Sequence, residues 1–147
     1  MLTEVFSLAV DVGAPQSIGR DAAGERRCVP ITGGTVTGKI SGVILSGGAD
    51  WQTLRPDGLA DLDARYMLKL EGGAQVEVWS RGLRIGPADV MAQLARGERV
   101  DPSAYYMRTA MRFETAAPDL QWLVHRLHVG IGERTPDQVR LKVFSVD

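Results

Sequence analysis

An acid and a large aromatic ring stand side by side at Asp50 and Trp51, one residue after the glycine pair Gly47-Gly48. Glycine allows backbone bends that residues with a Cβ atom resist, so this bend is predicted to present a carboxylate and an indole together. The segment Pro56-Asp57-Gly58 follows and is typical of a hairpin turn, and the strand after it carries Tyr66. A carboxylate, a phenol and a ring within one hairpin point to proton transfer on a small bound molecule.

Residues 105–115 form a second candidate, because strand alternation gives this segment one polar face and one apolar face. If the polar face points into a barrel, Arg108 and Glu114 must be paired, since an isolated buried charge costs several kcal/mol. Arg108 could then bind a carboxylate, phenolate or enolate of a ligand. If the apolar face points inward instead, the charged residues form a surface ladder, and the pattern leaves both arrangements open. The polar face carries Tyr106, Arg108, Arg112 and Glu114, and the apolar face carries Met107, Met111 and Phe113.

Metal and nucleotide sites are not indicated. His125 and His128 are three residues apart, which on a strand sends them to opposite faces, so a structural or surface role is favoured over a metal pair. His125 keeps an alternative role as a general acid or base, because the unperturbed histidine pKa lies near neutral pH. The glycine-rich segment 32–39 lacks the spacing of a phosphate-binding loop and precedes a strand. We therefore expect neither a metal nor another cofactor.

The composition of the chain limits the classes of binding partner and the cellular compartment that fit it. The 147 residues include 17 Lys and Arg against 18 Asp and Glu, a net charge of -1, which argues against a face that neutralises nucleic-acid phosphates. No apolar run reaches the length of a membrane span, and the first residues lack the features of a signal peptide. The single cysteine, Cys28, cannot form an intrachain disulfide, so a reducing cytoplasm fits best. The expected partner is a small molecule, with neither nucleic acid nor membrane.

The elements that must position these residues are mostly strands, because the segments between the dispersed glycines and prolines alternate with period two. One helix is predicted over Pro87–Arg96, plugging or flanking one end of the sheet, and Gly13–Gly24 is predicted to be a loop. About eight or nine strands with short connections favour a single all-β domain over residues 1–147, a small closed antiparallel β-barrel, with a two-sheet sandwich as the alternative. Strands are predicted over residues 5–12, 27–31, 35–45, 59–70, 75–85, 105–115, 120–131 and 139–146, together with a short one before the turn at 56–58.

A series of motifs runs in order along nearly the full length of the chain: VDVGAPQ, PITGGTVTG, GGADWQTLRPDG, LDARY, RGLRIGP, YYMRT with FET, WLVHRLHVG and VFSV. On these motifs the chain resembles domain of unknown function family three-two-three-seven. The resemblance implies a closed barrel with an internal pocket, a homo-oligomer and no required metal or nucleotide, but no settled activity. This sequence departs from the family pattern at Ser80, where the family commonly has Asn, and around His125. The residues that match the family's pocket set are Asp50, Trp51, Tyr66, Arg108, Glu114 and Trp122.

These observations lead to a functional hypothesis of cofactor-free acid/base catalysis, by a lyase, hydratase or isomerase, on a small oxygenated, aromatic or hydrophobic metabolite. Asp50 or Glu114 is the expected base, Tyr66 donates to a developing oxyanion and Arg108 holds an anion. The alternative is a carrier or sensor that binds such a molecule without changing it, and a third possibility is a purely structural oligomer. The expected substrate-binding side chains are Trp51, Ser80, Trp122 and His125.

Overall fold

The computed structural model describes residues 1–147, and its strands form one ten-stranded sheet. The two α-helices are short, and neither has the length and apolar character needed to cross a bilayer. The strands are β1 (Leu2–Val12), β2 (Gln16–Asp21), β3 (Gly24–Gly38), β4 (Gly42–Ile44), β5 (Gly48–Leu54), β6 (Ala60–Leu70), β7 (Gln75–Ile85), β8 (Tyr106–Glu114), β9 (His128–Arg134) and β10 (Gln138–Val146). The helices are α1 (Ala88–Ala95) and α2 (Gln121–Val124), with 3-10 turns η1 (Pro102–Ala104) and η2 (Pro118–Leu120).

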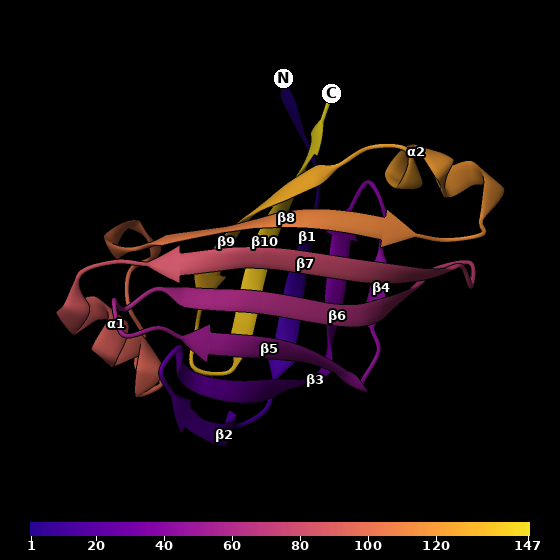
Figure 1. Cartoon of the computed structure of the whole chain (residues 1–147). Coiled ribbons are helices and arrows are strands. Elements are labelled where there is room, and N and C mark those ends of the chain that lie inside the picture. The colour runs from indigo at the N-terminus through magenta and orange to yellow at the C-terminus, as the bar shows by residue number, and fades with distance from the viewer.

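The sheet closes on itself because β1 pairs with β10 along one edge and with β3 along the other, antiparallel in both cases. The circuit continues from β3 through β5, β6, β7, β8 and β9 to β10, which makes an eight-stranded antiparallel barrel and confirms the predicted fold class. The two extra strands are β4, which pairs with the ends of β3 and β6, and β2, which pairs with β3. In Figure 1, β5 to β8 run across the front, and β1 and β10 cross behind them.

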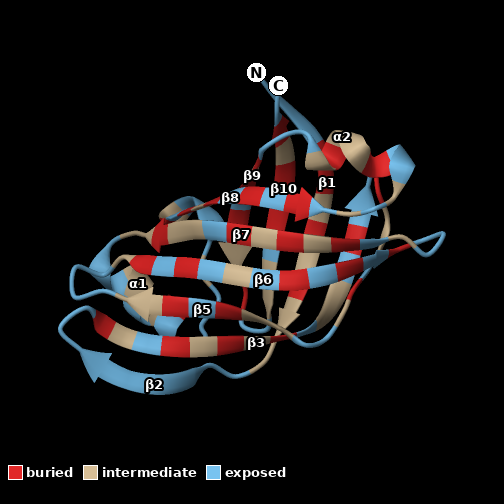
Figure 2. Cartoon of the chain, turned by 45° about the vertical axis from the view of Figure 1, so that its right-hand side comes forward, coloured by how far each residue is buried: buried red, intermediate tan, exposed pale blue.

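Strand alternation fills the barrel, as the banded colouring of Figure 2 shows. The larger core cluster contains 19 buried residues, among them Leu68, Val78 and Val143, none of which is exposed. A smaller cluster of five buried residues includes Leu94 of α1, which packs there with Leu62. The predicted helix is thus confirmed, and it covers one end of the barrel while α2 lies at the other end (Figure 1).

Three of the predictions made from the sequence were wrong. The separate strands predicted over 27–31 and 35–45 are instead one strand, β3, that runs from Gly24 to Gly38, followed after a break by the short β4. Gly13–Gly24, predicted to be a loop, contains β2, whose six residues are all exposed, so no buried apolar residue marks this strand in the sequence. Residues 120–131, predicted to be one strand, begin with η2 and α2, and the strand starts only at His128. Helical spacing instead buries both Leu120 and Leu123 in the larger core cluster, which strand alternation could not do for two residues three apart.

The approach of β7 to β8 leaves no room for a side chain at Gly82. A Cβ atom there would lie 2.1 Å from the carbonyl oxygen of Arg108 and 2.7 Å from the Cα atom of Thr109. Both atoms are backbone and are held by the β7–β8 ladder, so they cannot yield without disturbing the sheet. We expect Gly82→Ala to lower the free energy of unfolding by about 1–3 kcal/mol, measured by urea denaturation.

Gly33→Ala is the matched control, because the nearest atom to its new Cβ would be Asp11 Oδ2 at 3.7 Å, an ordinary contact. Its free energy of unfolding should stay within about 0.5 kcal/mol of the wild type. Equal effects of the two substitutions would show that the close strand approach does not limit stability.

Candidate functional site

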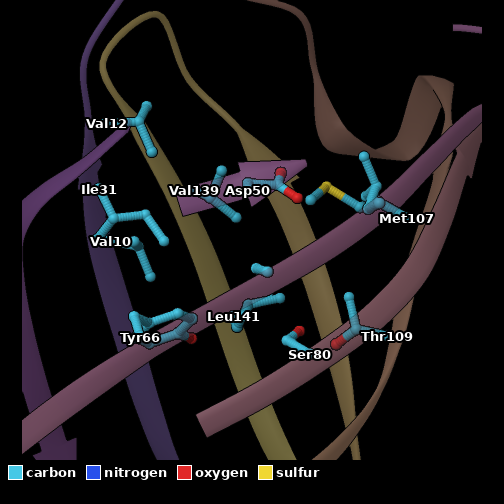
Figure 3. A pocket seen from close by; sticks show the side chains of 12 residues that line it. Val10, Val12, Ile31, Asp50, Tyr66, Ser80, Met107, Thr109, Val139 and Leu141 are labelled. Carbon is cyan, nitrogen blue, oxygen red and sulfur yellow. The ribbon is translucent and has the colours of Figure 1, made fainter. Parts of the chain in front are cut away.

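A cavity of about 30 Å³ lies inside the barrel between the two core clusters, with room for about two waters. Its wall is mainly apolar, and four polar side chains interrupt it: Asp50, Tyr66, Ser80 and Thr109. In Figure 3, Asp50 lies in the upper part of the cavity, and the three hydroxyl-bearing side chains lie in the lower part. The apolar wall consists of Val10, Val12, Ile31, Leu62, Ala64, Met107, Val139 and Leu141.

Asp50 faces the interior because alternation along β5 turns Asp50 and Gln52 inward. Its side chain is buried and accepts two hydrogen bonds, from Gln52 Nε2 to Oδ2 at 2.8 Å and from the backbone N–H of Asp63 to Oδ1 at 3.1 Å. Burial raises the pKa of the carboxyl, and these two hydrogen bonds oppose the shift. The raised pKa makes Asp50 a stronger base than an exposed aspartate, which suits it to proton transfer.

Gln52 connects Asp50 to a buried arginine. Its Oε1 accepts a hydrogen bond of 2.9 Å from Arg27 Nε, while its Nε2 donates to Asp50. Arg27 lies directly opposite Gln52 in the β3–β5 ladder, so both side chains stand on the interior face. The three residues form a hydrogen-bonded chain that fixes the orientation of the carboxylate.

Two of the hydroxyls around the cavity have no hydrogen-bond partner. Tyr66 is 4% exposed, and its OH is buried without a partner, as is Oγ1 of Thr109. Burial raises the pKa of Tyr66, and the nearby charge of Asp50 raises it further, so the phenol stays protonated. A protonated hydroxyl with its donor unused can donate to an oxygen of a ligand that enters the cavity.

Arginines occupy interior positions on three strands around Asp50. Arg84 on β7 lies directly opposite Met107, and Arg134 on β9 lies opposite Val139, so each is a cross-strand neighbour of a residue in the cavity wall. Arg27 on β3 completes the group. Burial lowers the pKa of all three guanidinium groups, that of Arg84 to about 10, and the arginines repel one another as well.

Three of the sequence-predicted site residues, Asp50, Tyr66 and Ser80, line the cavity. Trp51 does not: it is 43% exposed, because the residue after an inward Asp50 must point outward.

The polar face of β8 points outward, so Arg108 and Glu114 also lie outside the cavity and the surface-ladder arrangement is correct. The reason is packing: Met107, Met111 and Phe113 occupy the inward positions. The Arg108 guanidinium lies 4.9 Å from the ring centre of Tyr106, on the outer face.

Trp122 and His125 belong to the far end of the barrel and do not reach the cavity. Trp122 lies on α2 and packs against the larger core cluster, with Lys39 Nζ 4.0 Å from its ring centre. His125 is exposed at the C-terminus of α2. The mistaken assumption was a continuous strand over residues 120–131, which the helical turn interrupts.

The interior positions of Gln52, Thr109 and the three arginines were not predicted from the sequence. The signal was present in the alternation, because Arg84 shares the inward face of β7 with Val76, Val78 and Ser80. Extending that face by two strand repeats past Ser80 reaches Arg84. Charged residues are mostly exposed in proteins, and this general tendency is what concealed the pattern.

Known proteins resemble this chain over nearly its full length. A UPF0311 protein from Bradyrhizobium diazoefficiens is 41% identical, with 97% of this chain and 93% of the relative covered. The crystal structure of a conserved protein of unknown function from Rhodopseudomonas palustris is 42% identical, with 100% and 97% of the two chains covered and a TM-score of 0.95. A beta-barrel like protein from Acinetobacter baumannii is 39% identical, covers 100% and 96%, and has a TM-score of 0.87.

A more distant solved structure, an enzyme from Penicillium herquei, shares the fold with a TM-score of 0.75 at 19% identity, over 100% of this chain and 94% of that one. The family model described as "Protein of unknown function (DUF3237)" matches residues 1–146. The family resemblance drawn from the sequence motifs is therefore confirmed, and this chain, a closed barrel with an internal cavity, belongs to the DUF3237 family.

Proposed function

We propose that this protein is a cofactor-free acid/base enzyme of the lyase, hydratase or isomerase class, acting on a small oxygenated metabolite held in the barrel. The observation that carries the proposal is the buried Asp50 carboxyl, with a raised pKa, in the same cavity as the unpartnered Tyr66 hydroxyl. Two titratable groups with different preferred protonation states in one cavity suit the base and the oxyanion donor of such a reaction.

In the proposed reaction, the Asp50 carboxylate takes a proton from the carbon next to a carbonyl group of the substrate. The electron pair of that C–H bond moves toward the carbonyl oxygen, and the Tyr66 O–H donates to the resulting enolate. The protonated Asp50 then returns the proton, either to another carbon in an isomerisation or to a departing hydroxyl group in an elimination. Ser80 and Thr109 provide further hydroxyls for binding oxygen atoms of the substrate.

The cavity volume limits the substrate. About 30 Å³ holds only a few non-hydrogen atoms, so the reacting end of the substrate fits and a bulky ring does not. Met107 is the wall residue best able to move, because its unbranched side chain adapts to irregular space. The Penicillium herquei enzyme supports the view that this fold can house catalysis, although shared fold alone assigns no reaction.

Asp50→Asn is expected to lower turnover by at least about 100-fold, because it removes the base while keeping the size of the side chain. The purified protein is incubated in D₂O with phenolic, enone and keto-acid compounds, and deuterium incorporation and product formation are followed by NMR. Asp61→Asn, an exposed carboxylate on β6, is the matched control and should keep wild-type turnover. Ligands that raise the melting temperature without deuterium incorporation or product would favour the carrier instead.

Tyr66→Phe is expected to change turnover and the free energy of unfolding in opposite directions. Removing a buried hydroxyl that lacks a partner should raise the free energy of unfolding by about 1 kcal/mol. The same substitution should lower turnover, because the oxyanion loses its donor. Chemical denaturation and the deuterium assay are measured on the same preparation. A less stable variant with full turnover would contradict both expectations and indicate that the hydroxyl is structural.

The pH dependence of stability tests the raised pKa of Asp50. The folded state keeps the Asp50 proton to higher pH than the unfolded state, so this stabilisation is complete below the unfolded pKa of about 3.9. It is lost as the pH rises through the folded pKa. The free energy of unfolding of the wild type should therefore fall relative to that of Asp50→Asn as the pH rises from about 4 toward neutrality. A difference that stays constant with pH would contradict a raised pKa.

A further inference from the structure

The interior of the barrel carries more positive than negative charge. Arg27, Arg84 and Arg134 face inward around Asp50, the one carboxylate whose attraction acts on all three. All six ion pairs of the protein lie elsewhere, among side chains that are at least 32% exposed. Burying a guanidinium without an anion is costly, so this arrangement calls for a further negative group.

Arg84 is the arginine whose buried positive charge has the fewest hydrogen-bond and anionic partners. It is 2% exposed, its Nε is buried without a hydrogen-bond partner, and its side chain makes no ion pair. Arg27 differs, because its Nε donates to Gln52 and Glu25 attracts it. Arg134 differs as well, because Nη1 donates weakly to the carbonyl oxygen of Gln138 at 3.5 Å and Asp137 attracts the guanidinium.

The position of Arg84 connects this charge to the cavity. Directly opposite residues of an antiparallel pair point to the same side of the sheet, with Cβ atoms about 4.5–5.5 Å apart. Arg84 stands opposite Met107, and Arg134 stands opposite Val139, and both partners line the cavity. Asp50 on β5 also lines the cavity, and hydrogen bonds through Gln52 connect it to Arg27. None of the three arginines is a wall residue of the cavity, but Met107 is the cross-strand neighbour of Arg84, so an anion that reaches past Met107 would approach Arg84.

We propose that Arg84, supported by Arg134 and Arg27, binds the carboxylate group of a small organic acid whose remaining atoms occupy the internal cavity. The planar guanidinium fork matches a carboxylate through two parallel hydrogen bonds. The small volume and apolar wall favour a carboxylate with a short carbon chain over a phosphate ester. This inference rests on the proposed function for the site of the ligand and adds the substrate class, a short oxygenated carboxylic acid.

The test measures the binding of two probes, acetate and pyruvate, to the wild-type protein and to Arg84→Met. Sodium chloride at equal ionic strength is the reference, and inorganic phosphate is tested as a competing anion. Dissociation constants come from isothermal titration, and melting temperatures from circular dichroism. The probes should raise the melting temperature of the wild type, and Arg84→Met should weaken their binding by at least about tenfold, the loss of one charge-assisted contact. In chloride alone, Arg84→Met should melt no lower than the wild type, because it removes an uncompensated buried charge.

Arg65→Met is the matched control, since Arg65 pairs with Glu77 on the outer face and should leave acetate binding unchanged. If Arg84→Met does not fold, Arg134→Met, at a half-buried position, should show the same loss of binding. Equal acetate affinity in the wild type and the folded variant would overturn the assignment, as would stabilisation by phosphate but not by either carboxylate, or by chloride to the same extent.

The same measurements separate this inference from the proposed function. Asp50→Asn should bind acetate at least as tightly as the wild type, because it removes a competing negative charge, while it loses turnover. If carboxylate binding depends on Arg84 but no compound is turned over, the proposed anion site is supported and the proposed enzymatic function is rejected. If neutral compounds are turned over but carboxylates do not bind, the proposed anion site is rejected and the proposed enzymatic function is supported.

Discussion

Closure of the sheet by the β1–β3 ladder is the constraint on which the interior depends. Once β1 pairs on both edges, alternate residues of the eight barrel strands face inward except where a bulge shifts the register, and inward side chains away from the barrel ends are shut off from solvent. A polar residue at such a position either finds a partner or bears the cost of burial. The raised pKa of Asp50 and the lowered pKa of Arg84 are thus consequences of barrel closure.

Much of the fold could be predicted because it depends on local pattern. The turn at 56–58 has a positive φ of 89° at Gly58, as its residue types require, and alternation located most of the strands. The same alternation puts Tyr66 and Ser80 on the buried faces of β6 and β7. Local signals failed where the buried residues are too few to show a period, as in the exposed β2, or where a single helical turn interrupts a strand pattern, as at α2.

The candidate site was less predictable, because a strand with two informative faces does not indicate which one the barrel encloses. On β8 the aromatic and charged face attracted attention, yet the methionines and Phe113 face inward, since the core needs their volume. On β3, β7 and β9 arginines stand on inward faces, which the general preference of charge for solvent does not predict. In both cases the sequence leaves the choice of face open, because that choice depends on contacts between strands far apart in the sequence.

The buried polar atoms without partners are distributed unevenly, and this distribution argues for a binding interior. They belong to Tyr66, Arg84, Thr109 and His128. Two of these residues line the cavity, and Arg84 is the cross-strand neighbour of a third wall residue. A buried polar group that finds a partner in neither protein nor solvent costs about 1–3 kcal/mol relative to a paired one. His128 lies apart from the cavity, edge-on to Phe113 with ring centres 5.0 Å apart.

A barrel shaped only by stability would place Phe, Val and Met at the cavity positions, because apolar side chains of similar volume avoid these costs. The unpartnered groups also differ in kind: a neutral hydroxyl donor, a cationic donor and, beside them, one carboxylate with a raised pKa. Together they are complementary to a molecule with both an anionic group and a carbonyl oxygen, and such a molecule would satisfy donors that the protein alone leaves unused. The energetic cost of these polar groups is therefore the physical argument for the proposed function inside the barrel.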